Sequence, residues 1–287
     1  MNVVDLVAPS GPFEKALLPK IRTYLLEQGL KSRIPEQILG EDLISANSDE
    51  MRFKLLQQAL FSDKSDLIWC VRGGCGAARL LPRLKELEPP KKQKAFIGFS
   101  DITALHLFLN QVWGWQTIHG AGARQVVEQD VVQDSVALTE EILDAKLPLL
   151  EYTLRSLNQH AEGLSCEGAL TGGNLKIVES SLGTFWQIES QDKIVLLEEV
   201  NEYAYRVDRS LVHLLQAGVF EQAKAVVFGD FIFNGHAGEA EKIAAVLHRF
   251  ANELDIPVFS APFFGHGKVN SPWIYGQASI RNGVLVQ

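Results

Sequence analysis

The sequence predicts an α/β fold built on a parallel β-sheet, and three observations support this prediction. Short apolar segments recur at 3–7, 67–71 and 95–99. Segments with apolar residues at helical spacing lie between and after them. Turns rich in glycine and proline separate the two kinds of segment. Strands that alternate with helices in this way are typical of a parallel sheet covered on both faces.

The first strand, 3–7, is closed by the turn residues at 9–12, and a helix carrying Leu17, Ile21 and Leu25 ends at Gly29. We expect Pro82 to end the short helix that starts at Ala77. The other elements expected in this half are a helix at 51–61, a strand at 67–71, a helical turn at 83–87, a strand at 95–99 and a helix at 102–112.

The composition of the sequence and the spacing of its apolar residues change after residue 125, and we expect two domains joined by a linker. Residues 1–125 form the first domain, 126–164 a linker with helical turns and no clear strand, and 165–287 the second domain. Apolar strands are expected there at 193–197, 223–228 and 257–260, and helices at 208–217 and 240–254.

Composition excludes several classes of function. The chain has 287 residues and a net charge of −8, which argues against a nucleic-acid or anionic-membrane partner. Three cysteines without framework spacing favour a reducing compartment. The N-terminus lacks the basic region of a signal peptide, and no apolar stretch is long enough to span a membrane. We therefore expect a cytoplasmic globular protein.

The sharpest local feature is Ser100, which stands between an apolar strand and a helix. A serine on such a turn exposes its hydroxyl at the carboxyl edge of the sheet, next to helix N–H groups that can stabilise an oxyanion. Gly98 leaves room for a tight turn. Alternatively, Ser100 is only the N-cap of the helix, with Asp101 in its first turn; the segment alone favours this interpretation.

A second feature is the glycine-rich turn at 72–76, which also joins a strand to a helix. Its glycines allow close approach of the backbone to an anionic ligand. The spacing matches neither a Walker loop nor a dinucleotide fingerprint. Cys75 could be a nucleophile near a helix N-terminus, but a packing role is more common for such a residue.

A nucleophilic serine needs a base and an orienting acid. Among the seven histidines, His119 and His266 stand next to glycine in predicted loops, which often carry functional groups. Glu198 and Glu199 follow an apolar strand and are the candidate acids, unless they are only a solvated strand terminus. Composition and spacing choose neither between the two histidines nor between the two glutamates.

In these segments the sequence resembles the LD-carboxypeptidase family of serine peptidases, which includes microcin C self-immunity proteins. The resemblance covers nearly the whole chain in order. The segments that carry it are Val7-Ala8-Pro9-Ser10-Gly11, Arg72-Gly73-Gly74, 98–104, His119-Gly120, 171–175, Leu197-Glu198-Glu199-Val200, 205–209, Gly229-Asp230-Phe231 and Gly265-His266-Gly267. Several motifs in the right order make the serine-hydrolase interpretation the favoured one.

The resemblance implies a role for each matching position. Ser100 would be the nucleophile, His266 the general base, and Glu198 the acid that orients the imidazole. The oxyanion hole would use the Asp101 backbone N–H and a backbone N–H of the turn that contains Gly73 and Gly74. The implied fold is a Rossmann-like N-terminal domain and a C-terminal domain with a small β-barrel-like core.

The resemblance also implies a reaction. A muropeptide tetrapeptide would be cleaved between meso-diaminopimelate and the terminal D-alanine during peptidoglycan recycling in the cytoplasm. No metal or other cofactor is implied, and the sequence has no closely spaced ligand set for a metal. Arg72 is a candidate partner for a substrate carboxylate, and we expect a homodimer. Cys75 stands where the family pattern usually has tyrosine.

Three other functions compete with this one. A self-immunity hydrolase would cleave peptidyl or aminoacyl-adenylates and would need an aromatic surface for the adenine. A non-catalytic binding module would use the glycine-rich turn for an anion. An α/β-hydrolase is disfavoured because Ile102 occupies the second glycine position of G-x-S-x-G.

Overall fold

The computed structural model describes residues 2–40, 42–144, 146 and 148–287. The chain divides into two compact units, one ending at Pro148 and the other beginning at Leu149. This boundary differs from the expected linker at 126–164. Residues 126–148 belong to the first unit and contain α6 (Gln133–Leu143), and the remainder belongs to the second.

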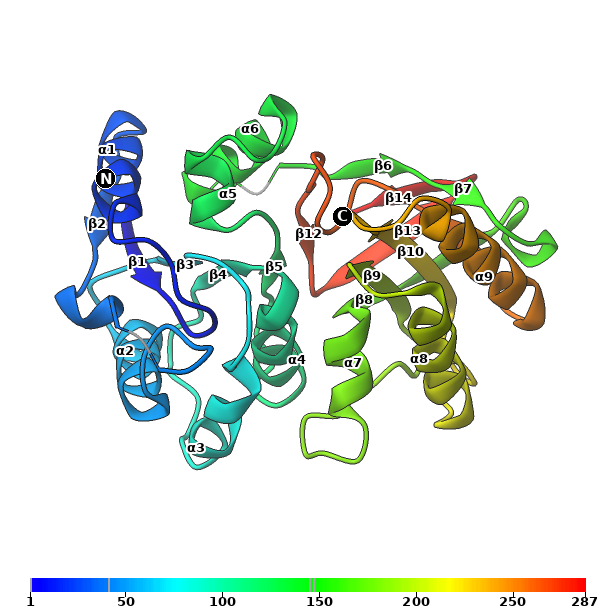
Figure 1. Ribbon diagram of the computed structural model, residues 1–287, viewed down its shortest axis with the longest axis horizontal. Coiled ribbons are helices and arrows are strands. Elements are labelled where there is room, and N and C mark those ends of the chain that lie inside the picture. The colour runs from blue at the N-terminus through cyan, green and yellow to red at the C-terminus, as the bar shows by residue number, and fades with distance from the viewer. Residues whose placement is uncertain (1, 41, 145, 147) are drawn as a thin grey trace. The chain divides into compact units, whose positions relative to one another are not determined.

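Among its described residues, the first unit contains five parallel strands in the order β5-β4-β3-β1-β2. Their bounds are β1 Val3–Val7, β2 Lys31–Arg33, β3 Leu67–Cys70, β4 Ala95–Gly98 and β5 Ile118–His119. The other helices are α1 Leu17–Glu27, α2 Asp49–Phe61, α3 Leu81–Lys85, α4 Thr103–Gln111 and α5 Ala123–Val127, with 3-10 turns η1 Glu36–Ile38, η2 Ala77–Leu80 and η3 Ser100–Ile102. Figure 1 shows α1 and α5 on one side of the strands and α2, α3 and α4 on the other.

The strand order creates a switch point between β1 and β3. The chain moves from β1 to one edge of the sheet and, from β3 onward, toward the opposite edge. The loops that follow β1 and β3 therefore flank the crevice in which open α/β sheets bind ligands. These loops hold Ser10-Gly11 and the glycine-rich turn at 72–76, and the Gly11 N–H donates to the Gly73 carbonyl over 3.2 Å.

Two helix boundaries in this unit differ from the predictions for local reasons. The helix predicted at 51–61 begins at Asp49, because Ser48 is its N-cap and accepts a hydrogen bond from the Met51 N–H. Pro82 does not end a helix; it lies in the first turn of α3, where proline is tolerated. The strands at 3–7 and 67–70 and the helix at 103–111 confirm the predicted pattern.

The second unit is built on an eight-stranded mixed sheet in the order β6-β14-β13-β8-β9-β10-β11-β7. The bounds are β6 Glu151–Thr153, β7 Arg155–Ser156, β8 Ser165–Asn174, β9 Ile194–Val200, β10 Ala225–Ile232, β11 Val258–Ser260, β13 Gln277–Arg281 and β14 Val284–Val286; β12 is Trp273–Ile274. Because β6 and β7 are separated only by Leu154 yet stand at opposite ends of this order, the sheet curls into a nearly closed barrel. The fold class predicted for both units is confirmed.

Strands β8, β9, β10 and β11 are parallel, and a helix follows each of the first three. These helices are α7 Leu175–Ser181, α8 Ala204–Gln216 and α9 Glu239–Glu253, and η4 is Gln159–Ala161. Figure 1 shows α7, α8 and α9 in succession beside the sheet. No helix within the described residues is long and apolar enough to cross a membrane.

Candidate active site

Ser100 lies on a strained turn directly after β4. Its φ is 65°, a left-handed conformation that is uncommon for a residue with a side chain. A Cβ on Gly98 would come within 2.8 Å of the Ile102 side chain, so the turn requires glycine there, as predicted. The N-cap interpretation of Ser100 is wrong, because Phe99 holds the N-cap position of η3 and no side chain caps that turn.

Asp101 joins this turn to the two loops at the switch point. Its buried carboxylate accepts hydrogen bonds from the Ser10 hydroxyl over 2.6 Å and from the Ala77 N–H over 2.8 Å. Burial raises the pKa of Asp101, and these hydrogen bonds oppose the rise. The side chain therefore fixes the end of the glycine-rich turn relative to Ser100.

The glycine-rich turn is in direct contact with Ser100. A Cβ added to Gly73 would lie 2.5 Å from the Ser100 Cβ and 2.8 Å from its hydroxyl oxygen. Gly74 has a φ of +131° and lies against the backbone of Gly11. Within the described part of the chain, the N–H groups of Gly73 and Gly74 donate to no protein acceptor. Such N–H groups beside a hydroxyl are suited to stabilise an oxyanion.

In the second unit, His266 and Glu198 form a close pair. The His266 Nδ1 lies 2.6 Å from the Glu198 Oε2. Glu198 is completely buried within β9, so the interpretation of a solvated strand terminus is wrong. Burial acts to lower the pKa of His266, but the charge and hydrogen bond of Glu198 outweigh it and raise the pKa above 6.5. A carboxylate on Nδ1 leaves Nε2 as the ring nitrogen for proton transfer.

Two further carboxyl groups surround this pair. Asp230 accepts a hydrogen bond from the Gly267 N–H over 3.0 Å, and burial together with the Glu198 charge raises its pKa to about 6. Glu199 accepts from the Asn174 side chain and from backbone N–H groups, and burial and Glu198 raise its pKa to about 7. No role was predicted for Asp230, although it lies in the Gly229-Asp230-Phe231 segment, which carries part of the family resemblance.

His119 and Cys75, the alternative candidates for the base and the nucleophile, lie in environments that do not suit these roles. His119 lies within β5 and is completely buried, so its placement in a loop is wrong. Cys75 is an exposed residue whose thiol is partly desolvated; this desolvation and the charge of Asp101 raise its pKa, which disfavours the thiolate that a nucleophile needs.

Arg72 borders a cavity of about 500 Å³ in the first unit. The cavity is lined by Pro12, Phe13, Glu14, Leu17, Gly40, Arg72, Arg124 and Glu128. The Arg72 guanidinium donates to the Pro12 carbonyl, and among the described residues it has no carboxylate within ion-pair distance. Burial and the charge of Arg124 lower its pKa. Arg124 itself is paired with Glu128 and Asp130.

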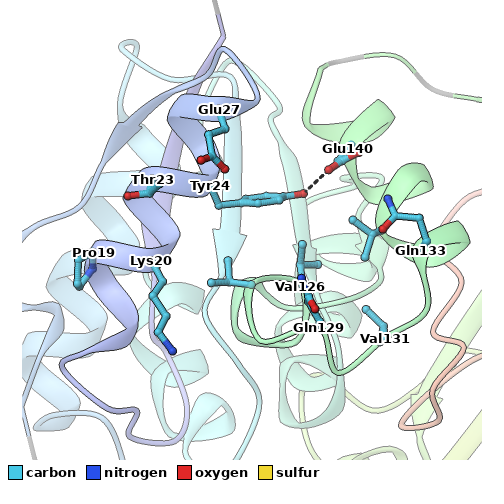
Figure 2. Close-up of a pocket in the computed structure, with 12 residues that line it drawn as sticks. Pro19, Lys20, Thr23, Tyr24, Glu27, Val126, Gln129, Val131, Gln133 and Glu140 are labelled. Carbon is cyan, nitrogen blue, oxygen red and sulfur yellow. Dashed lines mark hydrogen bonds between the residues drawn. The ribbon is translucent and has the colours of Figure 1, made fainter.

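A larger cavity, of about 750 Å³, lies between α1 and the segment from α5 to α6 (Figure 2). Tyr24 crosses it and donates a hydrogen bond to Glu140 over 2.8 Å. None of the predicted site residues lines this cavity. Within the described ranges, no group of three His, Cys, Asp or Glu side chains is arranged to hold a metal ion.

The predicted residues thus form two groups. Ser100, Gly73, Gly74 and Asp101 lie together in the first unit. Glu198 and His266 lie together in the second.

Family comparisons match both units. The profile of the LD-carboxypeptidase N-terminal domain matches residues 4–120, and that of the C-terminal domain matches residues 167–279. The chain therefore belongs to the LD-carboxypeptidase family, a family of serine carboxypeptidases.

Individual relatives cover most of the chain. One relative is a Rickettsia conorii protein that is named only provisionally as a carboxypeptidase. It is 41% identical over 280 residues, which cover 96% of this chain and 86% of that protein. The murein tetrapeptide carboxypeptidase of Pseudomonas aeruginosa is 28% identical, with coverages of 98% and 93%.

Solved structures show the same fold. The muramoyltetrapeptide carboxypeptidase of Oxalobacter formigenes superposes with a TM-score of 0.84 at 24% identity, covering 99% of this chain and 97% of that one. An MccF-like protein of Streptococcus pneumoniae, solved with AMP, gives 0.83 at 20% identity, with coverages of 99% and 98%.

Proposed function

We propose that this carboxypeptidase hydrolyses the bond between meso-diaminopimelate and the terminal D-alanine of muropeptide tetrapeptides, with Ser100, His266 and Glu198 as its catalytic triad. The observation that carries the proposal is the 2.6 Å contact between His266 and buried Glu198, because a neutral imidazole oriented by a carboxylate is the base that a serine nucleophile needs. The names of the murein carboxypeptidase relatives support the choice of substrate.

In the proposed mechanism, the Ser100 hydroxyl attacks the carbonyl carbon of diaminopimelate while His266 Nε2 takes its proton. The tetrahedral oxyanion accepts hydrogen bonds from the turn at Gly73 and Gly74 and from the Asp101 N–H. His266 then protonates the nitrogen of D-alanine as the C–N bond breaks. Water, activated by the same imidazole, hydrolyses the acyl-enzyme and releases the tripeptide.

Arg72 is proposed to bind the carboxylate of the terminal D-alanine. An exopeptidase must recognise a free chain end, and a guanidinium is the side chain best suited to a carboxylate. Its position next to Gly73 supports this role, and within the described residues no carboxylate lies within ion-pair distance of its guanidinium. We further propose that the reaction serves peptidoglycan recycling in the cytoplasm and that the enzyme is a homodimer.

Mass spectrometry tests the proposal. A meso-diaminopimelate tetrapeptide incubated with the wild-type protein should lose one D-alanine, and Ser100→Ala should reduce the rate at least about 10³-fold. Loss of D-alanine at the wild-type rate with Ser100→Ala would refute the triad. No loss with the wild-type protein would refute the substrate.

A second candidate is hydrolysis of peptidyl or aminoacyl-adenylates, as in microcin C self-immunity. An aromatic surface in the second unit favours it. The rings of Tyr203 and Tyr205 are stacked with their centroids 5.9 Å apart, and the centroid of the Phe233 ring lies 4.9 Å from that of Tyr203. Tyr205 is 54% exposed. Incubation with an aminoacyl sulfamoyl adenosine separates the two candidates, because only an adenylate hydrolase should cleave it.

A further inference from the structure

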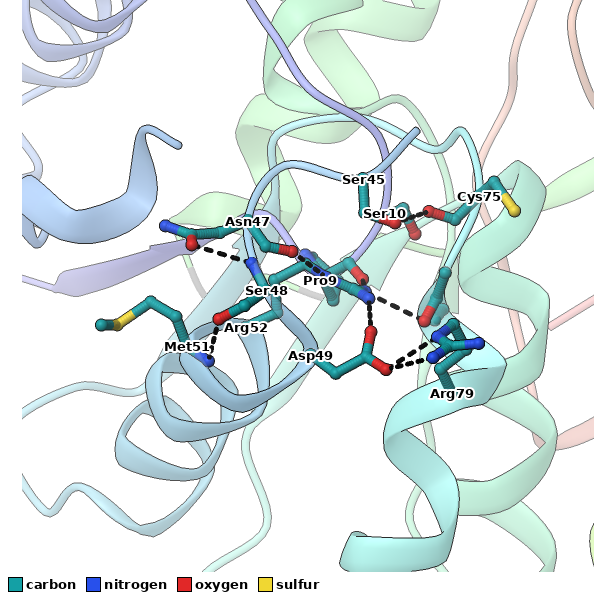
Figure 3. A network of polar contacts seen from close by, with 12 residues as sticks. Pro9, Ser10, Ser45, Asn47, Ser48, Asp49, Met51, Arg52, Cys75 and Arg79 are labelled. Carbon is teal, nitrogen blue, oxygen red and sulfur yellow. Dashed lines mark hydrogen bonds and ion pairs between the residues drawn. The ribbon is translucent and has the colours of Figure 1, made fainter. Parts of the chain in front are cut away.

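Arg52 is a buried cation that the mechanism above does not use. It lies in the first turn of α2 and is only 2% exposed. A buried guanidinium is costly unless its donors are satisfied. Here Nε donates to the Asn47 carbonyl over 2.9 Å, and Nη2 pairs with Asp49, which in turn pairs with the exposed Arg79 (Figure 3).

The remaining nitrogen of Arg52 bridges the two loops at the switch point. Nη1 donates to the Pro9 carbonyl in the loop after β1 and, over 2.9 Å, to the Gly76 carbonyl in the glycine-rich turn. Figure 3 shows this guanidinium between the two loops. A Cβ on Gly76 would come within 2.8 Å of Nη1, so the turn fits closely around the cation.

Other carbonyl groups of the same turn are held as well. The Gly11 N–H donates to the Gly73 carbonyl over 3.2 Å, and the Ser45 hydroxyl donates to the Cys75 carbonyl over 3.2 Å. Because a peptide group is planar, fixing the Gly73 carbonyl also fixes the direction of the Gly74 N–H. The Gly11 contact therefore orients the Gly74 N–H, and the anchors at Cys75 and Gly76 restrain the rest of the turn that carries it.

We propose that Arg52 is a positioning residue for the oxyanion hole: by joining the Pro9 and Gly76 carbonyls, it holds the Gly73 and Gly74 N–H groups where the oxyanion forms. Because Arg52 is buried, it would act through the two loops and not by contact with the substrate. The inference rests on the proposed acyl transfer to Ser100 but not on the identity of the peptide. Loss of the bridge should weaken transition-state stabilisation more than substrate binding.

The test compares Arg52→Gln and Arg52→Lys with Arg79→Gln, which removes the outer ion pair but no carbonyl contact. With the tetrapeptide, Arg52→Gln should lower kcat about 100-fold and change KM less than about threefold. Arg52→Lys should recover part of kcat, because its ammonium can still donate to carbonyl groups. Arg79→Gln should stay within about twofold of wild type. A kcat for Arg52→Gln within threefold of wild type, per folded molecule, would overturn the proposal.

A second measurement separates positioning from stability and from the choice of substrate. The rate at which a fluorophosphonate labels Ser100 should fall in parallel with kcat in the Arg52 variants, well below their melting temperatures. If the wild-type protein is labelled but does not cleave the tetrapeptide, the proposed substrate fails, and the labelling rates still decide the role of Arg52. Should Arg52→Gln not fold, Ser45→Ala removes only the Cys75 anchor; we expect it to slow labelling severalfold, and an unchanged rate would count against the proposal.

Discussion

The two groups of candidate residues are built by different physical means. In the first unit, Ser100 and its surroundings depend on backbone geometry: a φ of 65° and a glycine that leaves no space for a Cβ. In the second unit, His266 depends on charge, through one hydrogen bond to a completely buried carboxylate. An added methyl group should therefore damage the first group, and an isosteric loss of charge should damage the second.

The largest effect should come from removing the charge of Glu198. Glu198→Gln keeps the shape of the side chain but cannot stabilise the imidazolium, so kcat/KM should fall about 10³–10⁴-fold. Glu199→Gln is the matched control, because the hydrogen bonds of this neighbour go to the Asn174 side chain and to backbone N–H groups, and its charge has a smaller effect on the pKa of His266 than that of Glu198. It should lose less than about tenfold. Equal losses in both variants would contradict the choice of Glu198 over Glu199 as the acid that orients His266.

Gly73→Ala tests whether the site around Ser100 depends on the backbone geometry of the glycine-rich turn. Its methyl group would lie 2.5 Å from the Ser100 Cβ, so either the serine or the turn must move, and kcat/KM should fall about 10²–10³-fold. Gly114→Ala is the control: its φ of +71° is unfavourable for alanine, but no atom lies within 4 Å of the new Cβ. It should cost stability and leave activity unchanged. Full activity in Gly73→Ala would remove the argument for a tight oxyanion turn.

The pH dependence of kcat/KM tests whether the charge of Glu198 sets the pKa of His266. His266 must be neutral to accept a proton, and its pKa is raised, so activity should rise with pH through a value above 6.5. In Glu198→Gln the largest raising influence is removed, while burial, which lowers the pKa, remains together with the smaller raising effects of the Glu199 and Asp230 charges. The residual activity of that variant should therefore rise at a lower pH than in the wild type. If kcat/KM rose at the same pH in the wild type and in Glu198→Gln, Glu198 would not set the pKa of His266.

The smallest expected effect concerns stability. The pKa of Glu199 is raised to about 7 from an ordinary value of 4.5, so the folded state binds a proton that the unfolded state releases between these values. The free energy of unfolding should therefore decrease as pH rises from about 4.5 to 7, by about 2 kcal/mol from this group. Urea unfolding at pH 5 and pH 7.5 should show a smaller decrease in Glu199→Gln. An unchanged decrease would assign the titration to another group.

Local signals predicted the first unit well. The strands, the helix after Ser100 and the requirement for Gly98 follow from neighbouring residues, because each turn is specified within a few positions. The role of Lys94 was not predictable from its neighbours in the sequence: it is buried and donates to the Ala59 carbonyl and to the Ser65 hydroxyl. Only the folded chain brings those acceptors to it.

The second unit shows where local patterns fail. Strand β8 was missed because its glycines interrupt the apolar pattern; Gly172 is required because a Cβ would lie 1.9 Å from the Leu196 carbonyl oxygen in β9. Residues 198 and 199 are both buried, and successive side chains of a strand point to opposite faces. Which glutamate meets His266 therefore depends on the packing of the loop after β11, 68 residues away.

The proposed triad makes the reactivity of Ser100 in the first unit dependent on His266 in the second. The most direct test is the rate at which a fluorophosphonate labels Ser100, read by mass spectrometry of the peptide that contains it. His266→Ala should slow labelling more than about 100-fold. His213→Ala, which removes an exposed histidine from α8, should leave the rate unchanged. Labelling of Ser100 in His266→Ala at the wild-type rate would refute the proposed role of His266 as the base.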